Sequence, residues 1–265
     1  MNQPSASSTG EFPWWLVVAA IIAATIAILI AASDLYSQVF ATVSKGVTIT
    51  VFVTGVAFAF ASLIGLGTAL MALSGSVVLR QIARFYVETI RGVPVLVLLF
   101  WIAFAGVPAF VAVWNLATAP LQDAGMLEPL LVRDVSLLWR AIIALTIGYS
   151  AFISEVFRAG IQSVDGGQIE AAKALGLSRF QRFRLIILPP LGNDFVAMVK
   201  DSSLVSVLGV ADITQMGKIY ASGSFRFFET YSIVAYIYLI LTVSLSLALR
   251  ALEKRLRQGE AQRSR

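Results

Sequence analysis

Six long apolar stretches divide the chain, and short polar segments between them hold most of its charges. A helix needs about 17 to 25 apolar residues to cross a membrane, and lipid offers no hydrogen-bond partners to a backbone in any open conformation. We therefore predict an all-α integral membrane protein with about six transmembrane helices. The predicted spans are residues 14–32, 47–73, 94–114, 136–157, 195–213 and 231–249.

The composition supports the membrane assignment and restricts the chemistry. Hydrophobic residues make up 58% of the chain and charged residues 13%, with a mean hydropathy of +0.84, which is outside the range of soluble domains. The chain contains no cysteine and no histidine. It therefore cannot form a disulfide, a thiolate nucleophile, a histidine acid–base pair or a common zinc site. These absences argue against an enzyme.

The basic residues predict the orientation in the membrane. In a soluble chain a net charge of +5 would suggest nucleic acid, but in a membrane protein Lys and Arg accumulate in cytoplasmic loops, so we expect no nucleic-acid partner. One set of alternate loops and the C-terminal tail holds Arg80, Arg84, Arg91, Arg158, Lys173, Arg179, Arg182, Arg184, Arg250, Lys254, Arg255, Arg257, Arg263 and Arg265. The other loops hold only Lys45, Arg133, Lys218 and Arg226 among basic residues. We predict that the basic loops and both termini are cytoplasmic.

The N-terminal span has an alternative interpretation. The segment before it contains no Lys or Arg, and no clear small-residue cleavage site follows it, so we interpret it as a helix and not as a signal peptide. The alternative is five spans, with the first segment cleaved or lying at the interface.

The polar segment 158–194 has internal secondary-structure signals that a passive connector does not need. We expect a short helix over residues 168–175, ended by Gly176 as a C-terminal cap. Ser178 is placed as the N-cap of a second helix, which the proline pair at 189–190 should terminate. Two short helices on a basic loop would form a cytoplasmic docking element.

This segment contains the pattern E-A-A, three residues, G, nine residues, I-x-L-P. The residues that match it are Glu170, Ala171, Ala172, Gly176, Ile186, Leu188 and Pro189. The chain thus resembles the inner-membrane permeases of ATP-binding-cassette (ABC) importers, in the polar amino acid uptake family. "YVETIRGVPVLVLLF", "SEVFRAGIQSVDGGQIEAAKALG" and "KDSSLVSVLGVADI" are similar to the same family, and the resemblance extends over about residues 45–252.

The resemblance implies a type I importer core of five helices plus one N-terminal helix. It also implies an extracytoplasmic solute-binding protein, two permease subunits that are identical or homologous, and two ATPase subunits in a prokaryotic plasma membrane. The permease carries an amino acid, and its E-A-A loop couples it to the ATPase through Glu170, Ala171, Ala172, Gly176, Leu188 and Pro189. The chain has no G-x-x-x-x-G-K-[ST] phosphate loop, so ATP and Mg belong to the partner ATPase and we expect no cofactor here.

The resemblance also suggests a division of the chain. Residues 1–40 hold the N-terminal segment and first helix, residues 45–252 form the transporter domain with the coupling loop 158–194, and residues 253–265 form a basic tail.

Ionisable residues near the ends of predicted spans are candidates for the substrate path. A charge at membrane depth is costly and points to function. Glu155, Lys200 and Asp201 qualify, together with Ser202, Ser203 and Phe152, and they either contact the solute or form a structural ion pair or gate. The family often has tyrosine where this chain has Phe152 and threonine where it has Ser202. For Arg140 we favour a structural role.

Two further expectations are simpler. Gly65 and Gly67 should permit close helix packing, and Glu88 and Arg91 should form a salt-bridged support for the coupling region. A secondary transporter, a channel and a structural membrane protein remain alternatives. The first would show inverted repeats, the second would show a filter, and the third would not need the capped loop.

Overall fold

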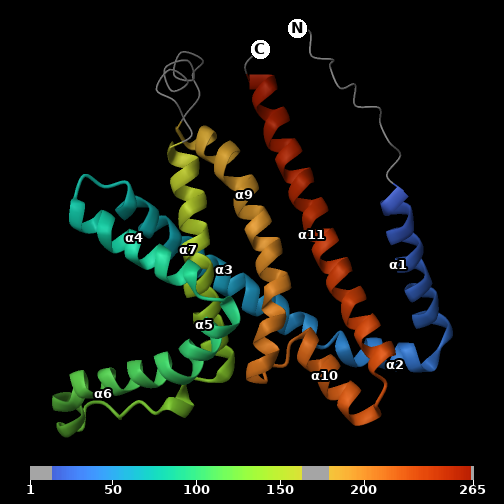
Figure 1. The fold of residues 1–265 in the computed structure, drawn as a ribbon, viewed down its shortest axis with the longest axis horizontal. Helices are drawn as coiled ribbons and strands as arrows, with labels where there is room; N and C mark the ends of the chain where they lie inside the picture. Colours follow the sequence, from blue (N-terminus) through green and yellow to red (C-terminus); the bar gives the residue numbers. More distant parts are fainter. Residues whose placement is uncertain (1–13, 163–178, 264–265) are drawn as a thin grey trace.

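The structure is a computed structural model that describes residues 14–162 and 179–263, and within these ranges it is helical with no strand (Figure 1). Its α-helices are α1 (Trp14–Ala32), α2 (Asp34–Val43), α3 (Gly46–Ala72), α4 (Val77–Gly92), α5 (Val95–Trp101), α6 (Val107–Asp123), α7 (Leu137–Gln162), α9 (Arg179–Asp201), α10 (Ile213–Ser224) and α11 (Phe227–Arg263). Between them lie the π-helical turn η1 (Ile102–Gly106) and the 3-10 helices η2 (Val132–Asp134) and η3 (Ser202–Leu208). The predicted fold class is confirmed.

Four helical segments in the described ranges are long and apolar enough to cross a membrane. They are Asp34–Ala72, Val95–Asp123, Leu137–Gln162 and Phe227–Arg255, and a shorter apolar helix covers Val17–Ala32. Five of the six predicted spans therefore correspond to helices. Helix α1 has the predicted bounds, whereas α7 and α11 extend beyond theirs.

The fifth predicted span, residues 195–213, is wrong. Helix α9 ends at Asp201, and the apolar run continues as the 3-10 helix η3. Gly209 then adopts the left-handed conformation with φ 80°, which favours glycine, and Asp212 caps α10 by accepting a hydrogen bond from the Gln215 amide at 2.8 Å. Gly209 thus ends η3 and Asp212 begins α10, so no single helix extends over residues 195–213.

The proline pair also does not end a helix, which corrects the prediction for this segment. Helix α9 continues through Pro189 and Pro190 to Asp201. A proline removes one backbone donor and disfavours a helix, but packing against neighbouring helices can compensate for the lost bond in membrane proteins. Ile187, just before the pair, is buried in the main core. The packing of Ile187 thus helps to hold the helix through the prolines, of which Pro189 is partly buried and Pro190 exposed.

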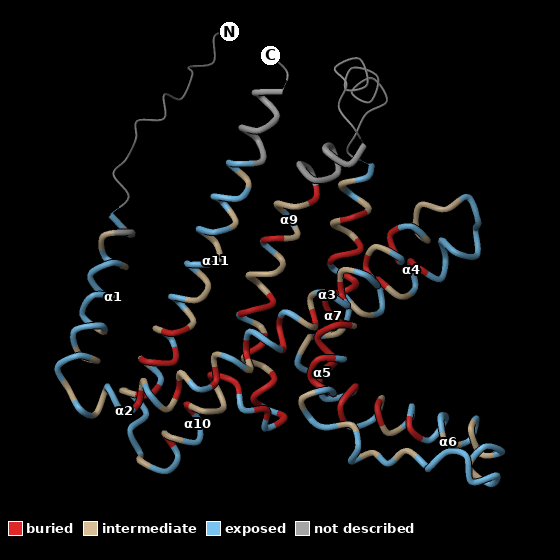
Figure 2. Tube along the Cα trace, turned by 180° about the vertical axis from the view of Figure 1, so that it is seen from behind, coloured by how far each residue is buried: buried red, intermediate tan, exposed pale blue. Residues whose placement is uncertain are grey.

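The main core lies where α3 and α7 cross, and buried residues concentrate there and on the adjoining part of α9 (Figure 2). Gly65 makes the crossing close: a Cβ at this position would lie 2.9 Å from both the Ser150 carbonyl oxygen and Ile153 Cγ2. A Cβ at Gly67 would meet nothing within 4 Å. The packing role predicted for both glycines holds for Gly65 and not for Gly67 within the described residues.

A second core joins α2, α10 and α11. Val39, Val43, Ile213 and Ile233 are fully buried in it. Gly46 fits against the start of α10, since a Cβ there would lie 2.4 Å from the Asp212 carbonyl carbon. The two cores hold the helices in one bundle, from which α6 projects with most of its surface exposed (Figures 1 and 2).

The helix ends separate into two groups in both views. The start of α1, the end of α7, the start of α9 and the end of α11 lie at one end of the molecule, and α2, α6 and α10 lie at the other (Figures 1 and 2). Arg158 and Arg250 belong to the first group, while Asp34 and Asp123 belong to the second.

Candidate functional site

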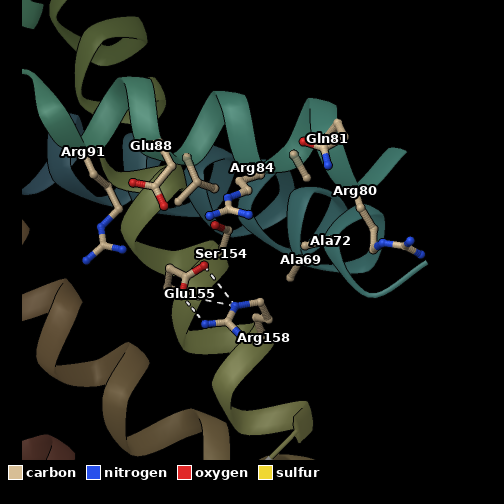
Figure 3. A pocket seen from close by; sticks show the side chains of 12 residues that line it. Ala69, Ala72, Arg80, Gln81, Arg84, Glu88, Arg91, Ser154, Glu155 and Arg158 are labelled. Atoms are coloured by element: carbon tan, nitrogen blue, oxygen red, sulfur yellow. Dashed lines mark hydrogen bonds and ion pairs between the residues drawn. The ribbon is translucent and has the colours of Figure 1, made fainter. Parts of the chain in front are cut away.

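A cavity of about 380 Å³ lies between the end of α3, helix α4 and the second half of α7 (Figure 3). Most of its polar side chains are charged, and they come from α4 and α7. The lining residues are Ala69, Ala72, Arg80, Gln81, Ala83, Arg84, Val87, Glu88, Arg91, Ser154, Glu155 and Arg158. Glu155 is the predicted path residue among them.

The charge of Glu155 is neutralised by an arginine on the same helix. Arg158, one turn further along α7, donates from Nη2 to Glu155 Oε2 at 2.6 Å and from Nε to both carboxylate oxygens at 3.0 and 3.2 Å. Arg158 also donates from Nη1 to Gln162 Oε1 at 2.7 Å. The fork holds the carboxylate in a defined orientation while leaving about a third of the side chain exposed. A paired, one-third exposed carboxylate is available to a polar ligand only in competition with Arg158.

Two of the predicted path residues, Phe152 on α7 and Asp201 at the end of α9, each contact a side chain on a neighbouring helix. The Tyr149 hydroxyl on α7 donates to Asp201 Oδ2 at 2.7 Å, which joins α7 to the end of α9. One turn along α7, the Phe152 ring lies 6.2 Å from the Tyr149 ring and 5.6 Å from the Arg91 guanidinium carbon on α4. Tyr149, Phe152 and Glu155 therefore form a strip on α7 between α4 and α9.

The rest of the predicted "KDSS" segment is less closely tied to this strip. Lys200 is exposed, and no ion pair between Lys200 and Glu155 occurs in the part of the chain that the structure describes. Ser202 is fully buried, and its hydroxyl donates to the Val199 carbonyl at 2.8 Å. Ser203 is partly buried. The structure thus brings Phe152, Glu155 and Asp201 onto or against one helix and leaves Lys200 outside.

Glu88 and Arg91 do not form the predicted salt bridge. Among the described residues the ion pairs are Arg158 with Glu155 and Arg226 with Glu229. Helix α4 is instead fixed to α7 by Tyr86, whose hydroxyl lies 2.5 Å from Ser150 Oγ and donates to the Ile147 carbonyl at 3.3 Å. Burial raises the pKa of Tyr86, so this hydroxyl keeps its proton.

Arg140 has the structural surroundings that we expected. It is buried, and it donates to three backbone carbonyl oxygens: Val135 at 2.9 Å, Ala103 at 3.1 Å and Val132 at 2.5 Å. These carbonyls belong to η1 and to the segment around η2. Arg140 therefore fastens the segment before α7 to the preceding helix.

The predicted coupling residues lie at the edge of the described chain. Glu170, Ala171, Ala172 and Gly176 fall outside the described residues, and so does Ser178. Leu188 and Pro189 lie in α9, half-buried beside the core residue Ile187. The described ends of α7 and α9 flank the gap at the same end of the molecule (Figure 1).

Sequence reasoning missed two residues of this site. Tyr149 precedes Phe152 by three residues, so helical spacing alone places both on one face of α7. The spacing from Glu155 to Arg158 is likewise three residues and could have identified the pair. No group of three or more metal-ligating side chains occurs among the described residues.

Comparison with known proteins extends these observations. A family model described as "Binding-protein-dependent transport system inner membrane component" matches residues 61–258. The chain is 37% identical over 216 residues to the "Probable amino-acid permease protein YxeN" of Bacillus subtilis (strain 168), which covers 78% of this chain and 88% of that protein. It is 33% identical over 221 residues to the "Glutamine transport system permease protein GlnP" of Escherichia coli (strain K12), which covers 80% and 92%.

A solved structure is also similar. It is described as "Crystal structure of an amino acid ABC transporter with histidines", and it aligns with a TM-score of 0.62 and 36% identity over 83% of this chain and 95% of that one. A methionine ABC transporter structure aligns with a TM-score of 0.57 at 20% identity, which supports the fold.

Proposed function

The chain belongs to the family of binding-protein-dependent transport system inner membrane components, and we propose that it forms the path for an amino acid in an ABC importer. The observation that carries this proposal is the similarity to amino-acid permeases over about nine-tenths of their length. Members of this family are transporter subunits and not enzymes, with ATP hydrolysis on a separate chain. This chain is accordingly a multi-pass membrane protein with several apolar helices.

The proposed coupling element is the E-A-A loop between α7 and α9. Glu170, Ala171, Ala172 and Gly176 would dock on the ATPase, while Leu188 and Pro189 anchor the loop to the bundle through α9. Closure of two ATPase subunits by ATP would move the docked loop as a rigid lever, and α7 and α9 would rock with it. The hydrogen bond between Tyr149 and Asp201 supports this proposal, because it links the two helices that flank the loop.

The proposed solute path follows the strip on α7 and the end of α9. A zwitterion inside a membrane protein needs partners for its ammonium and carboxylate groups. Glu155, Asp201 and Lys200 supply both signs of charge, Ser203 supplies a hydroxyl group, and Phe152 supplies a shape-selective wall. The Ser202 hydroxyl is buried and bonded to the Val199 carbonyl, so it would support the backbone of this segment. Under this proposal Arg158 releases Glu155 when the solute ammonium arrives.

The proposed assembly contains two ATPase subunits, a second permease that is identical or homologous, and an extracytoplasmic binding protein. Both termini and the loop after α7 would face the cytoplasm of a prokaryotic cell. The common location of the α7, α9 and α11 ends supports this orientation (Figure 1).

Reconstitution of the complex in liposomes tests coupling and path separately. Glu170→Ala and Gly176→Pro should leave assembly and ATP hydrolysis in place while uptake falls, because they alter the docking element and not the path. Glu155→Gln and Lys200→Met should reduce uptake of every accepted amino acid, and Phe152→Tyr should change the ratio among them. Wild-type uptake in both loop variants would refute the coupling assignment, and poor assembly of the charge variants with an unchanged ratio would refute the path.

A further inference from the structure

The strip on α7 has no free cation of its own, as far as the structure describes it. Its carboxylates are Glu155 and, from the end of α9, Asp201. The Arg158 guanidinium is already bonded to Glu155 and to Gln162 Oε1. Lys200 is exposed and forms no ion pair with Glu155 in the described ranges. The strip therefore offers acceptors for an ammonium group but no free donor for a carboxylate.

Arg91 lies beside this strip, at the C-terminal end of α4, and lines the same cavity as Glu155. Its guanidinium carbon lies 5.6 Å from the centre of the Phe152 ring, a distance at which a cation and an aromatic face attract each other. Its charge also acts electrostatically on Glu155, although the two side chains form no ion pair. In the view of Figure 3, Arg91 and Arg158 lie on opposite sides of the Glu155 carboxylate. Arg91 thus brings a positive charge to the strip from a second helix.

The Arg91 guanidinium is available to an anion. It forms no ion pair with a carboxylate of the described residues, and Glu88, one turn earlier on α4, does not pair with it. Its side chain is exposed. Arg84 also lines the cavity without an ion pair, but the cation–π contact with Phe152 belongs to Arg91. Among the described arginines of the cavity, Arg91 is therefore the free one that contacts the strip.

We propose that Arg91 binds the α-carboxylate of the transported amino acid while Glu155 binds its ammonium group, an inference that rests on the proposed function. A guanidinium fork donates two parallel hydrogen bonds to a carboxylate. The two charged groups of an α-amino acid are attached to the same carbon, so an arginine and a glutamate that are close but unpaired can bind both. The substrate class would be free α-amino acids, and their amides would be rejected.

Equilibrium binding to the complex purified in detergent tests this role. The binding protein is left out, because it selects among solutes itself. The ligands are the amino acid that the wild-type complex takes up fastest from a panel and its α-carboxamide, both tritiated and titrated separately. The wild type should bind the amino acid at least about tenfold more tightly than the amide, since losing a hydrogen bond to a charged group costs about that factor. Arg91→Gln should lose this preference, because only its binding of the amino acid weakens.

Four variants serve as controls. Arg91→Lys keeps the charge without the fork, so its preference should be intermediate. Arg84→Gln removes the same charge from the same helix, two turns away, and should keep the wild-type preference. Arg158→Gln and Lys200→Met remove the other two cations near the strip and should also keep it. Assembly of each variant is checked by size-exclusion chromatography, and if Arg91→Gln does not assemble, the comparison of Arg91→Lys with Arg84→Gln decides.

Three results would overturn the inference. The first is an equal affinity of the wild type for amino acid and amide, or an unchanged preference in the Arg91 variants. The second is a weakening of both ligands by the same factor in Arg91→Gln, which would show that Arg91 shapes the cavity without contacting the carboxylate. The third is loss of the preference in Arg158→Gln or Lys200→Met instead. Failure of the proposed function is distinguishable from these, because the wild-type complex would then take up no amino acid of the panel.

Discussion

Two glycines on the same helix predict opposite responses to the same substitution. Gly65 and Gly67 both lie in the interior of α3, so alanine improves helix propensity by about 1 kcal/mol at each. At Gly65 the new Cβ would lie 2.9 Å from the Ser150 carbonyl oxygen and 3.1 Å from the Ser154 amide nitrogen. Real Cβ atoms do not approach backbone atoms this closely, and backbone cannot turn aside as a side chain can.

Helix α7 must therefore move away from α3 in Gly65→Ala. Overpacking of this kind costs about 1–3 kcal/mol, whereas Gly67→Ala meets no atom within 4 Å and carries no such cost. The free energy of unfolding should thus be about 1–3 kcal/mol lower in Gly65→Ala than in Gly67→Ala. For a chain of this size that difference corresponds to several degrees in the unfolding midpoint.

Thermal unfolding of both variants in the same detergent measures this difference, with the wild type as reference. Gly65→Ala should also reduce uptake, because the displaced helix carries the strip formed by Tyr149, Phe152 and Glu155. Equal midpoints for the two variants, or a lower midpoint for Gly67→Ala, would refute the close α3–α7 crossing.

Further predictions concern single contacts and the topology. Tyr149→Phe removes the donor to Asp201, so unfolding free energy should fall by about 1–3 kcal/mol and uptake should fall with it, as measured by thermal unfolding and liposome uptake. Arg140→Leu leaves three carbonyl oxygens without their donor and should lower the unfolding free energy by about 3 kcal/mol, so a midpoint equal to that of the wild type would contradict the fastening role. Asp212→Ala removes the cap of α10 and should cost about 1 kcal/mol in the same assay. Cysteine at Ser178 should react only with a reagent added from the cytoplasm and cysteine at Ala124 only from outside, with no background because the chain has no native cysteine; the reverse pattern would overturn the orientation.

The apolar periodicity was sufficient to predict the helices but not where each one ends. Length and hydropathy locate α1, α3, α7 and α11, because a membrane span must be both long and apolar. They fail after Asp201, where Gly209 and Asp212 are ordinary stop and start signals inside an apolar run. The expectation that Pro189 and Pro190 end a helix fails for another reason, because the packing of Ile187 in the core helps to offset the intrinsic cost of proline in a helix.

For the site, too, some residues could be identified from the sequence while most of their contacts could not. Glu155, Asp201 and Phe152 could be selected from the sequence, because charge at membrane depth and family resemblance both point to them. Their partners could not, since the contact between Tyr149 and Asp201 depends on how α7 packs against α9. Spacing on one helix does predict the pairing of Glu155 with Arg158, but it predicts the pairing of Glu88 with Arg91 equally well. Only the first of these pairs forms in the structure.

The central claim is that this chain couples amino-acid movement to a separate ATPase. The most direct measurement is ATP hydrolysis by the complex reconstituted in liposomes with its ATPase and binding protein, screened against a panel of amino acids, for the wild type and Glu170→Ala. We expect that a restricted set of amino acids stimulates hydrolysis and drives uptake in the wild type, and that Glu170→Ala separates hydrolysis from uptake. Uptake that proceeds without ATP, or hydrolysis that no amino acid in the panel stimulates, would contradict it.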